Sequence, residues 1–299
     1  GADGNVARDS QGNVIAKTVN LIETLGGDDI GNYTITKQGT TMATINPKAI
    51  DISGAGLIAA DNKVYNGNAL AMLNTSGLTD AALVTAGMVT GDDVDVTATG
   101  AFTNKNVGNS KTVNITYDPL GGADAGNYTF TGQSTANANI TAKALDLSGS
   151  SIITAADKVY DGLATATLDF SGLTDAVLIS AGMVAGDDLD ISGQGVFRNN
   201  ADNANDANVS WVSDIAGGTV DDKTVAITYA SLAGTDAGNY SFTGQASTTA
   251  KITPKTVTVS GLTAANKTYN RDAAATVSGS AATFVGVIVG EAITVDSAS

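Results

Sequence analysis

The chain has 299 residues, with 30 acidic and 15 basic side chains, no cysteine and no histidine. These counts exclude disulfides, cysteine or histidine catalysis, and metal or haem sites of the usual ligand types. The formal net charge of −15 lacks the basic footprint of nucleic-acid binding and disfavours anionic membranes. No apolar run reaches the ~20 residues of a membrane span, so we expect neither a nucleic-acid partner nor membrane insertion.

Turn and strand formers dominate the composition. Only two acidic residues, Glu23 and Glu291, are glutamates; the others are aspartates, which favour turns and caps over helix interiors. The 35 glycines supply turn conformations, and the abundant threonine and valine favour strands. The composition therefore predicts an all-β protein.

Internal repeats organise the chain. The segment that begins at Lys63 (Lys-Val-Tyr-Asn-Gly) returns 95 residues later at Lys158 (Lys-Val-Tyr-Asp-Gly), and a Gly-Asp-Asp motif recurs at the same spacing. The ends of the chain carry parts of the same series, so we expect a piece of a longer tandem array. The predicted units are residues 1–47 (the C-terminal part of a repeat), 48–142 (a full repeat), 143–254 (a full repeat with an insert at 199–218) and 255–299 (the N-terminal part of a repeat).

Short strands follow one another within each repeat. In the second full repeat, alternating or β-branched runs bounded by turn residues predict seven strands, at 143–148, 152–160, 164–170, 189–197, 223–230, 239–245 and 248–253. Residues 80–87 and 175–182 suit a short helix or a strand equally well, with Thr79 or Asp80 as a cap and Gly87 as a stop. Seven short strands predict an immunoglobulin-like β-sandwich, repeated in tandem and arranged end to end.

A pattern Asp-x-Gly-x-Tyr occurs three times, near the end of each repeat. Immunoglobulin-like domains have a similar tyrosine corner, in which the hydroxyl returns to the backbone of the preceding turn. We therefore expect the aspartate to cap that turn and the glycine to take its strained position; a glycine turn before a core tyrosine is the alternative. The residues concerned are Asp29, Gly31, Tyr33, Asp124, Gly126, Tyr128, Asp236, Gly238 and Tyr240.

The ordered motifs of the second full repeat resemble the YDG-type repeat. They are Tyr160-Asp161-Gly162, Gly186-Asp187-Asp188, residues 236–240 and Ile252-Thr253-Pro254-Lys255. YDG repeats and the related MBG repeats occur in very large bacterial surface adhesins, many of them filamentous-haemagglutinin-like. The resemblance implies an exported stalk or matrix protein, and departures such as Asn66 in place of the aspartate suit a structural role for the motif.

Calcium is a metal that the remaining side chains suit, because it takes oxygen ligands. Each Gly-Asp-Asp motif offers two carboxylates, on Asp92, Asp93, Asp187 and Asp188. The alternative is that these aspartates are solvated turn residues. Adjacent aspartates on a strand face opposite sides and make a poor catalytic pair, so we expect no enzyme activity.

Three aromatic residues are candidates for ligand contact. Trp211, the one tryptophan, lies in the asparagine-rich insert, where it suits either a sugar or the covered end of a core. Tyr65 and Tyr160 precede Asn-Gly and Asp-Gly turn dipeptides, where core packing competes with ligand stacking.

These features lead to three hypotheses of function. The first is a non-enzymatic stalk segment of an exported surface or biofilm-matrix adhesin, which spaces an adhesive tip from the cell or links cells. The alternatives are a calcium-dependent surface-layer or filament subunit and a carbohydrate-binding module. The expected partners are neighbouring repeats of the same chain and an exopolysaccharide or cell-surface glycan, at an extracellular location.

Overall fold

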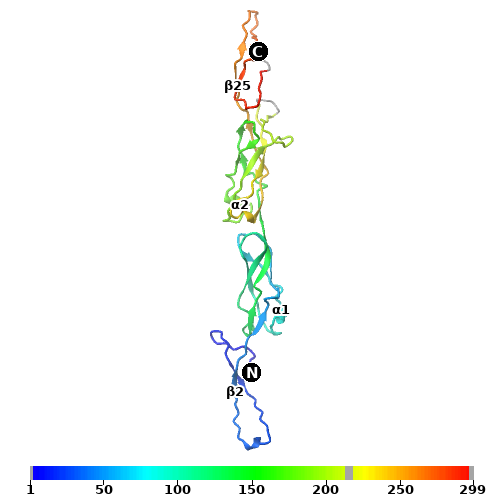
Figure 1. Ribbon diagram of the computed structural model, residues 1–299, viewed down its shortest axis with the longest axis vertical. Helices are drawn as coiled ribbons and strands as arrows, with labels where there is room; N and C mark the ends of the chain where they lie inside the picture. The colour runs from blue at the N-terminus through cyan, green and yellow to red at the C-terminus, as the bar shows by residue number, and fades with distance from the viewer. Residues whose placement is uncertain (1–2, 213–217, 296–299) are drawn as a thin grey trace. The chain divides into compact units, whose positions relative to one another are not determined.

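The computed structural model describes residues 3–212 and 218–295, so residues 213–217 of the predicted insert lie outside the described residues. Most of its elements are short β-strands, with few helices, as an all-β fold requires (Figure 1). The chain divides into two compact units, Gly1–Ala142 and Lys143–Ser299. The boundary lies where the sequence places the junction of two full repeats. Among the described residues, no helix is long and apolar enough to cross a membrane.

The first unit begins with a small antiparallel pair and continues with a β-rich body. Its elements are β1 (Lys17–Asn20), η1 (Ile30–Asn32), β2 (Thr40–Ala43), β3 (Lys48–Asp51), β4 (Ala59–Ala60), β5 (Lys63–Val64), β6 (Leu70–Ala71), β7 (Leu73–Asn74), α1 (Asp80–Thr85), β8 (Ala98–Phe102), β9 (Gly108–Tyr117), η2 (Ala125–Asn127), β10 (Tyr128–Thr131) and β11 (Thr135–Thr141). A five-stranded sheet has the order β5-β11-β9-β8-β6, while β3 pairs with β10 and β4 pairs with β7.

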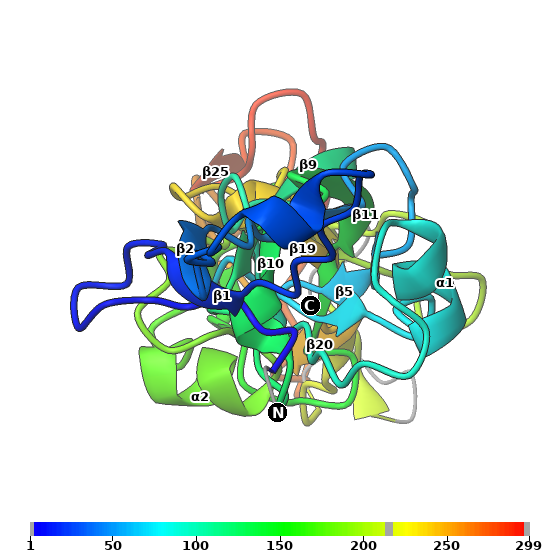
Figure 2. The ribbon, with the colours of Figure 1, turned by 90° about the horizontal axis from the view of Figure 1, so that it is seen from below.

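Two pairs of strands in this body run parallel. Lys48 lies opposite Tyr128 in the β3–β10 pair, and β5 pairs with β11 in the same sense. Ile50 and Ile52, at alternate positions beginning in β3, are fully buried and pack with Leu83 of α1. One buried cluster of the unit therefore lies between the parallel pair and the helix, which projects to one side of the strands in Figure 2.

The second unit begins with the order of elements found in residues 48–142 and continues with a further set of short strands. They are β12 (Lys143–Asp146), β13 (Thr154–Ala155), β14 (Lys158–Val159), β15 (Thr165–Ala166), β16 (Leu168–Asp169), α2 (Asp175–Ser180), β17 (Gly193–Phe197), β18 (Lys223–Tyr229), η4 (Ala237–Asn239), β19 (Tyr240–Thr243), β20 (Ser247–Ala250), β21 (Ile252–Thr253), β22 (Thr258–Ser260), β23 (Thr263–Ala264), β24 (Val277–Ser278) and β25 (Thr283–Val285).

The strand pairings of the first unit recur in the second. β12 runs parallel to β19, with Lys143 opposite Tyr240, and β14 runs parallel to β21. A four-stranded sheet has the order β15-β17-β18-β20. Phe197, Val225 and Ile252 are fully buried in its core. All seven segments that the sequence marks as strands contain strands, although three of them are broken into two short pieces.

The ambiguous segments after β7 and β16 are helices. Thr79 caps α1, because its hydroxyl accepts a hydrogen bond from the Ala82 backbone N–H at 3.2 Å. Gly87 follows the helix with φ +127°, a conformation that glycine tolerates best. The stop at Gly87 and the Thr79 alternative for the cap therefore agree with the structure.

Candidate functional site

Hydrogen bonds join the Gly-Asp-Asp loop to the Asp-x-Gly-x-Tyr turn in each full repeat. In the first unit, the Asp93 backbone N–H donates to Asp124 Oδ2 at 3.0 Å, and the Ala123 N–H donates to Asp93 Oδ2 at 2.9 Å. The Asp124 N–H also donates to the Asp93 carbonyl at 3.0 Å. We call the set Asp92, Asp93, Asp124 and Tyr128 the clasp of the first unit.

The tyrosine completes the clasp. The Tyr128 hydroxyl donates to Asp92 Oδ2 at 2.5 Å and accepts from the Val89 backbone N–H at 3.0 Å. Burial and the hydrogen bond to Asp92 raise the pKa of Tyr128, so the neutral hydroxyl is the stable form. A buried strand residue therefore holds a loop that lies more than 35 residues before it in the sequence.

The second unit has the same clasp, formed by Asp187, Asp188, Asp236 and Tyr240. The Tyr240 hydroxyl donates to Asp187 Oδ2 at 2.6 Å and accepts from the Val184 N–H at 2.9 Å. The Asp188 N–H donates to Asp236 Oδ2 at 3.2 Å. Two copies with the same bonds show that these positions hold loops together.

The clasp corrects the expected tyrosine corner in two respects. The hydroxyls of Tyr128 and Tyr240 bond to the Gly-Asp-Asp loop, whereas the corner requires the turn just before the tyrosine. Asp29, Asp124 and Asp236 occupy the N-cap positions of η1, η2 and η4 but make no side-chain cap bond there. In the two full repeats, the carboxylate of this aspartate instead accepts from the Gly-Asp-Asp loop.

The strained glycine is also a different residue from the one expected. Gly31, Gly126 and Gly238 have ordinary φ angles and open space around them. The positive φ angles belong to Gly122 (+95°) and Gly234 (+101°), where an added Cβ would lie 2.4 and 2.3 Å from the carbonyl oxygens of Asp93 and Asp188. A glycine two positions before the aspartate occurs in all three copies of the motif, so the sequence itself marks the strained position.

The first copy of the motif lacks these contacts. Residues 30–32 form the 3-10 turn η1, as in the full repeats. Tyr33 is 72% exposed, against 6% for Tyr128 and 8% for Tyr240. The turn therefore forms without burial of its tyrosine, and the clasp requires the Gly-Asp-Asp loop as well.

The carboxylates proposed as calcium ligands are engaged within the protein. Asp92 and Asp187 accept from tyrosine hydroxyls, and Asp93 and Asp188 accept from backbone N–H groups. Within residues 3–212 and 218–295, no group of three or more acidic side chains is placed to hold a metal ion. Calcium binding stays a prediction.

Tyr65 and Tyr160 occupy equivalent positions but different environments. Tyr65 is 1% exposed and belongs to the core of the first unit. Tyr160 is half-buried, and its hydroxyl donates to the Glu291 carboxylate. This hydrogen bond is the main reason that the pKa of Tyr160 is raised.

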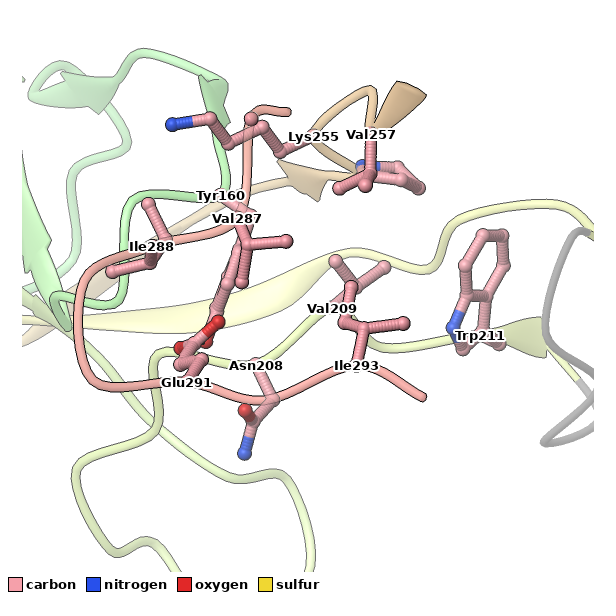
Figure 3. Close-up of a pocket in the computed structure, with 12 residues that line it drawn as sticks. Tyr160, Asn208, Val209, Trp211, Lys255, Val257, Val287, Ile288, Glu291 and Ile293 are labelled. Atoms are coloured by element: carbon pink, nitrogen blue, oxygen red, sulfur yellow. The ribbon is translucent and has the colours of Figure 1, made fainter. Parts of the chain in front are cut away.

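Tyr160 and Trp211 line one cavity in the second unit, with a volume of about 350 Å³. Figure 3 shows Trp211 at one end, Tyr160 and Glu291 at the other, and Val209 and Ile293 between them. We call this space the insert cavity. The sequence marked both aromatic residues as ligand candidates but did not place them together, and it did not identify Glu291.

Buried polar contacts fix the insert beside this cavity. Lys223 is only 1% exposed, and its ammonium forms an ion pair with Asp206 and donates to the Asn208 carbonyl at 2.8 Å. Burial alone would raise the pKa of Asp206, but the hydrogen bonds from Lys223 and Asn208 lower it. Trp211 then forms an isolated antiparallel bridge with Val220.

Comparison with known proteins identifies one part of the chain. No curated protein matches the chain. Residues 46–137 match the YDG domain family, and this segment contains β3 to β10 and the whole clasp of the first unit. A YDG domain therefore occupies residues 46–137 of the chain.

Proposed function

We propose that this chain is a tension-bearing, non-enzymatic stalk segment of a large exported bacterial surface or biofilm-matrix adhesin. The observation that carries the proposal is the parallel pairing of the strand that opens each full repeat with a strand near its end, β3 with β10 and β12 with β19. The YDG domain at residues 46–137 supports the adhesin context, because the YDG-type repeats that the sequence resembles occur in such proteins.

Parallel pairing matters because of how force enters a unit. Tension along the chain pulls β3 by its N-terminal end, while the opposite pull enters the unit through β11, which follows β10, and holds β10 in place toward its C-terminal end. In a parallel pair these two ends lie at opposite ends of the ladder, so the hydrogen bonds are loaded together in shear. An antiparallel hairpin pulled by its two free ends would instead open one bond at a time.

The proposal extends the YDG fold to the second unit. Residues 143–254 repeat the parallel pairs, the helix and the clasp of the first unit, and we assign them as a second YDG-type domain with an insert. On this view each domain is an immunoglobulin-like sandwich that carries load by itself. The aspartates and tyrosines of the clasps are occupied in holding loops, which supports a structural role rather than a reaction.

Single-molecule force spectroscopy in two pulling directions tests load bearing. The chain has no native cysteine, so introduced cysteines are unique handles. Pulling from the chain ends loads β3–β10 in shear. Pulling between Asn46→Cys and Gly126→Cys loads the same end of both strands and unzips them; Asn46 is exposed and Gly126 has open space around it.

The shear direction should need several times the force of the unzipping direction. Unfolding of the two full repeats should also lengthen the chain in two steps of roughly 34 and 40 nm, at about 3.6 Å per residue. Equal forces in the two directions would overturn the load-bearing role. Antibody labelling of intact producing cells tests the location, and labelling only after permeabilisation would contradict an exported stalk.

A further inference from the structure

We propose that the insert cavity of the second unit binds a neutral sugar residue of a glycan. The cavity combines an aromatic face, apolar walls, hydrogen-bonding groups of both kinds and a volume of about 350 Å³. Small-molecule sites share this combination of mostly apolar walls with a few polar groups. The inference is independent of the stalk proposal.

Trp211 supplies the aromatic face. Its side chain is half-buried, so part of the indole stays accessible at the cavity. The cluster of buried residues in this unit centres on Phe197, Val225 and Ile252 and does not include Trp211. An indole offers a flat apolar surface together with one N–H donor, which suits the C–H face and the hydroxyl edge of a sugar ring.

The polar groups of the cavity select a neutral ligand. Glu291 provides an exposed carboxylate acceptor, Asn208 an amide, and Lys255 an exposed ammonium donor. One cation and one anion leave the lining without net charge, which favours hydroxyl groups over a phosphate or a carboxylate. The Tyr160 hydroxyl donates to Glu291 and restricts that carboxylate to the cavity.

The second unit alone has the parts needed for this site. The insert that carries Asn208 and Trp211 is anchored by the buried Lys223–Asp206 ion pair. The first unit has no corresponding insert, and its equivalent tyrosine, Tyr65, is 1% exposed. Anchoring of the insert fixes the positions of Asn208, Val209 and Trp211, the insert residues that line the cavity.

The one tryptophan of the chain makes binding directly observable. We would screen the intact protein on an array of neutral glycans (β-glucans, mannans, galactans and N-acetylglucosamine polymers) with anionic polysaccharides alongside. The neutral oligosaccharide with the highest signal would then be titrated to about 10 mM, the range of weak binding, while the Trp211 fluorescence is followed. We expect saturable binding and a change in tryptophan emission.

Two variants locate the site. Trp211→Ala should reduce affinity at least tenfold, and Glu291→Gln should reduce it severalfold, with unchanged melting temperatures. Tyr269→Ala is the matched control, because Tyr269 is an 85% exposed aromatic residue of the same unit that does not line the cavity; it should bind as the unmodified protein does. No binding by any neutral glycan, binding of anionic polysaccharides only, or undiminished binding by Trp211→Ala would overturn the proposal.

Discussion

A single hydroxyl connects distant parts of each full repeat. Tyr128 reaches Asp92 and the Val89 N–H, and Tyr240 makes the corresponding bonds to Asp187 and Val184. Both rings are buried at the start of a strand that belongs to the parallel pair. The side chain therefore couples the Gly-Asp-Asp loop to the element that we expect to carry load.

Removal of this hydroxyl should destabilise one unit. Tyr128→Phe removes a hydrogen bond to a carboxylate and leaves the Val89 N–H without this acceptor, so the first unit should lose about 2 kcal/mol of its free energy of unfolding. Urea unfolding measures this loss of free energy, with hydrogen exchange of peptides from β9 as the signal for the first unit. Tyr33→Phe is the control, with an expected change below about 0.5 kcal/mol, because Tyr33 is 72% exposed. Equal losses in the two variants would contradict the clasp.

The raised pKa of Tyr128 gives the clasp a pH dependence at the alkaline side. A group with a raised folded-state pKa contributes stability that is fully present below its unfolded value, about 10 for tyrosine, and is lost as pH rises through the folded value. The stability difference between the unmodified protein and Tyr128→Phe should therefore be constant near neutral pH and shrink above pH ~10. A difference that stays constant to pH ~12 would exclude this linkage.

At the scale of elements, the loop after each helix supports the strand that opens the unit. The Asp51 N–H donates to the Ala86 carbonyl at 3.0 Å, and the Asp146 N–H donates to the Ala181 carbonyl at 3.1 Å. Gly87 and Gly182 follow in the positive-φ region, packed against the carbonyls of Ala49 and Ala144. The opening strand is thus held on both edges, by the helix loop and by its parallel partner.

A side chain at Gly87 should disrupt this support. A Cβ there would lie 2.2 Å from the Ala49 carbonyl oxygen, and the φ of +127° is strained for any other residue. Gly87→Ala should cost the first unit about 3 kcal/mol or more, measured by urea unfolding. Gly91→Ala separates the two effects: Gly91 has a φ of +97° but open space, so it should cost only about 1 kcal/mol of strain. Similar losses in both variants would show that the close contact contributes little.

The sequence predicted which segments are strands, but it did not predict which strands pair. Alternation in β12 and β18 follows from burial of one face, which a sequence records directly. The parallel partners of β3 and β12 lie far along the chain, and nothing local in Lys48–Asp51 marks Tyr128–Thr131 as its neighbour. The hydrogen-bond partners of Tyr128 and Tyr240 were misassigned, because a motif shows a residue type and not its contacts.

The insert cavity shows the same limit of prediction from the sequence. Trp211 was noticeable as the one tryptophan, and Tyr160 as part of a repeated motif. Glu291 lies 131 positions after Tyr160, in a segment without a repeated acidic motif. Only the folded chain places these three residues around one cavity.

At the scale of the whole molecule, each compact unit has its own sheet, parallel pair and clasp. Hydrogen exchange should therefore show that Tyr128→Phe lowers protection only in residues 48–142 and Tyr240→Phe only in residues 143–254. The double variant should equal the sum of the two single changes. Loss of protection that spreads across the junction of Ala142 and Lys143 would contradict independent units.

Parallel pairing also sets when a unit completes its fold during synthesis. Lys48 leaves the ribosome 80 residues before its partner Tyr128, which is roughly 4–16 s at ~5–20 residues per second. β10 (Tyr-Thr-Phe-Thr) and β19 (Tyr-Ser-Phe-Thr) are nearly identical, so either could receive β3. We expect vectorial emergence to resolve this competition, because β10 becomes available before β19 exists. Refolding of the complete chain from denaturant lacks that order and should yield more swapped species.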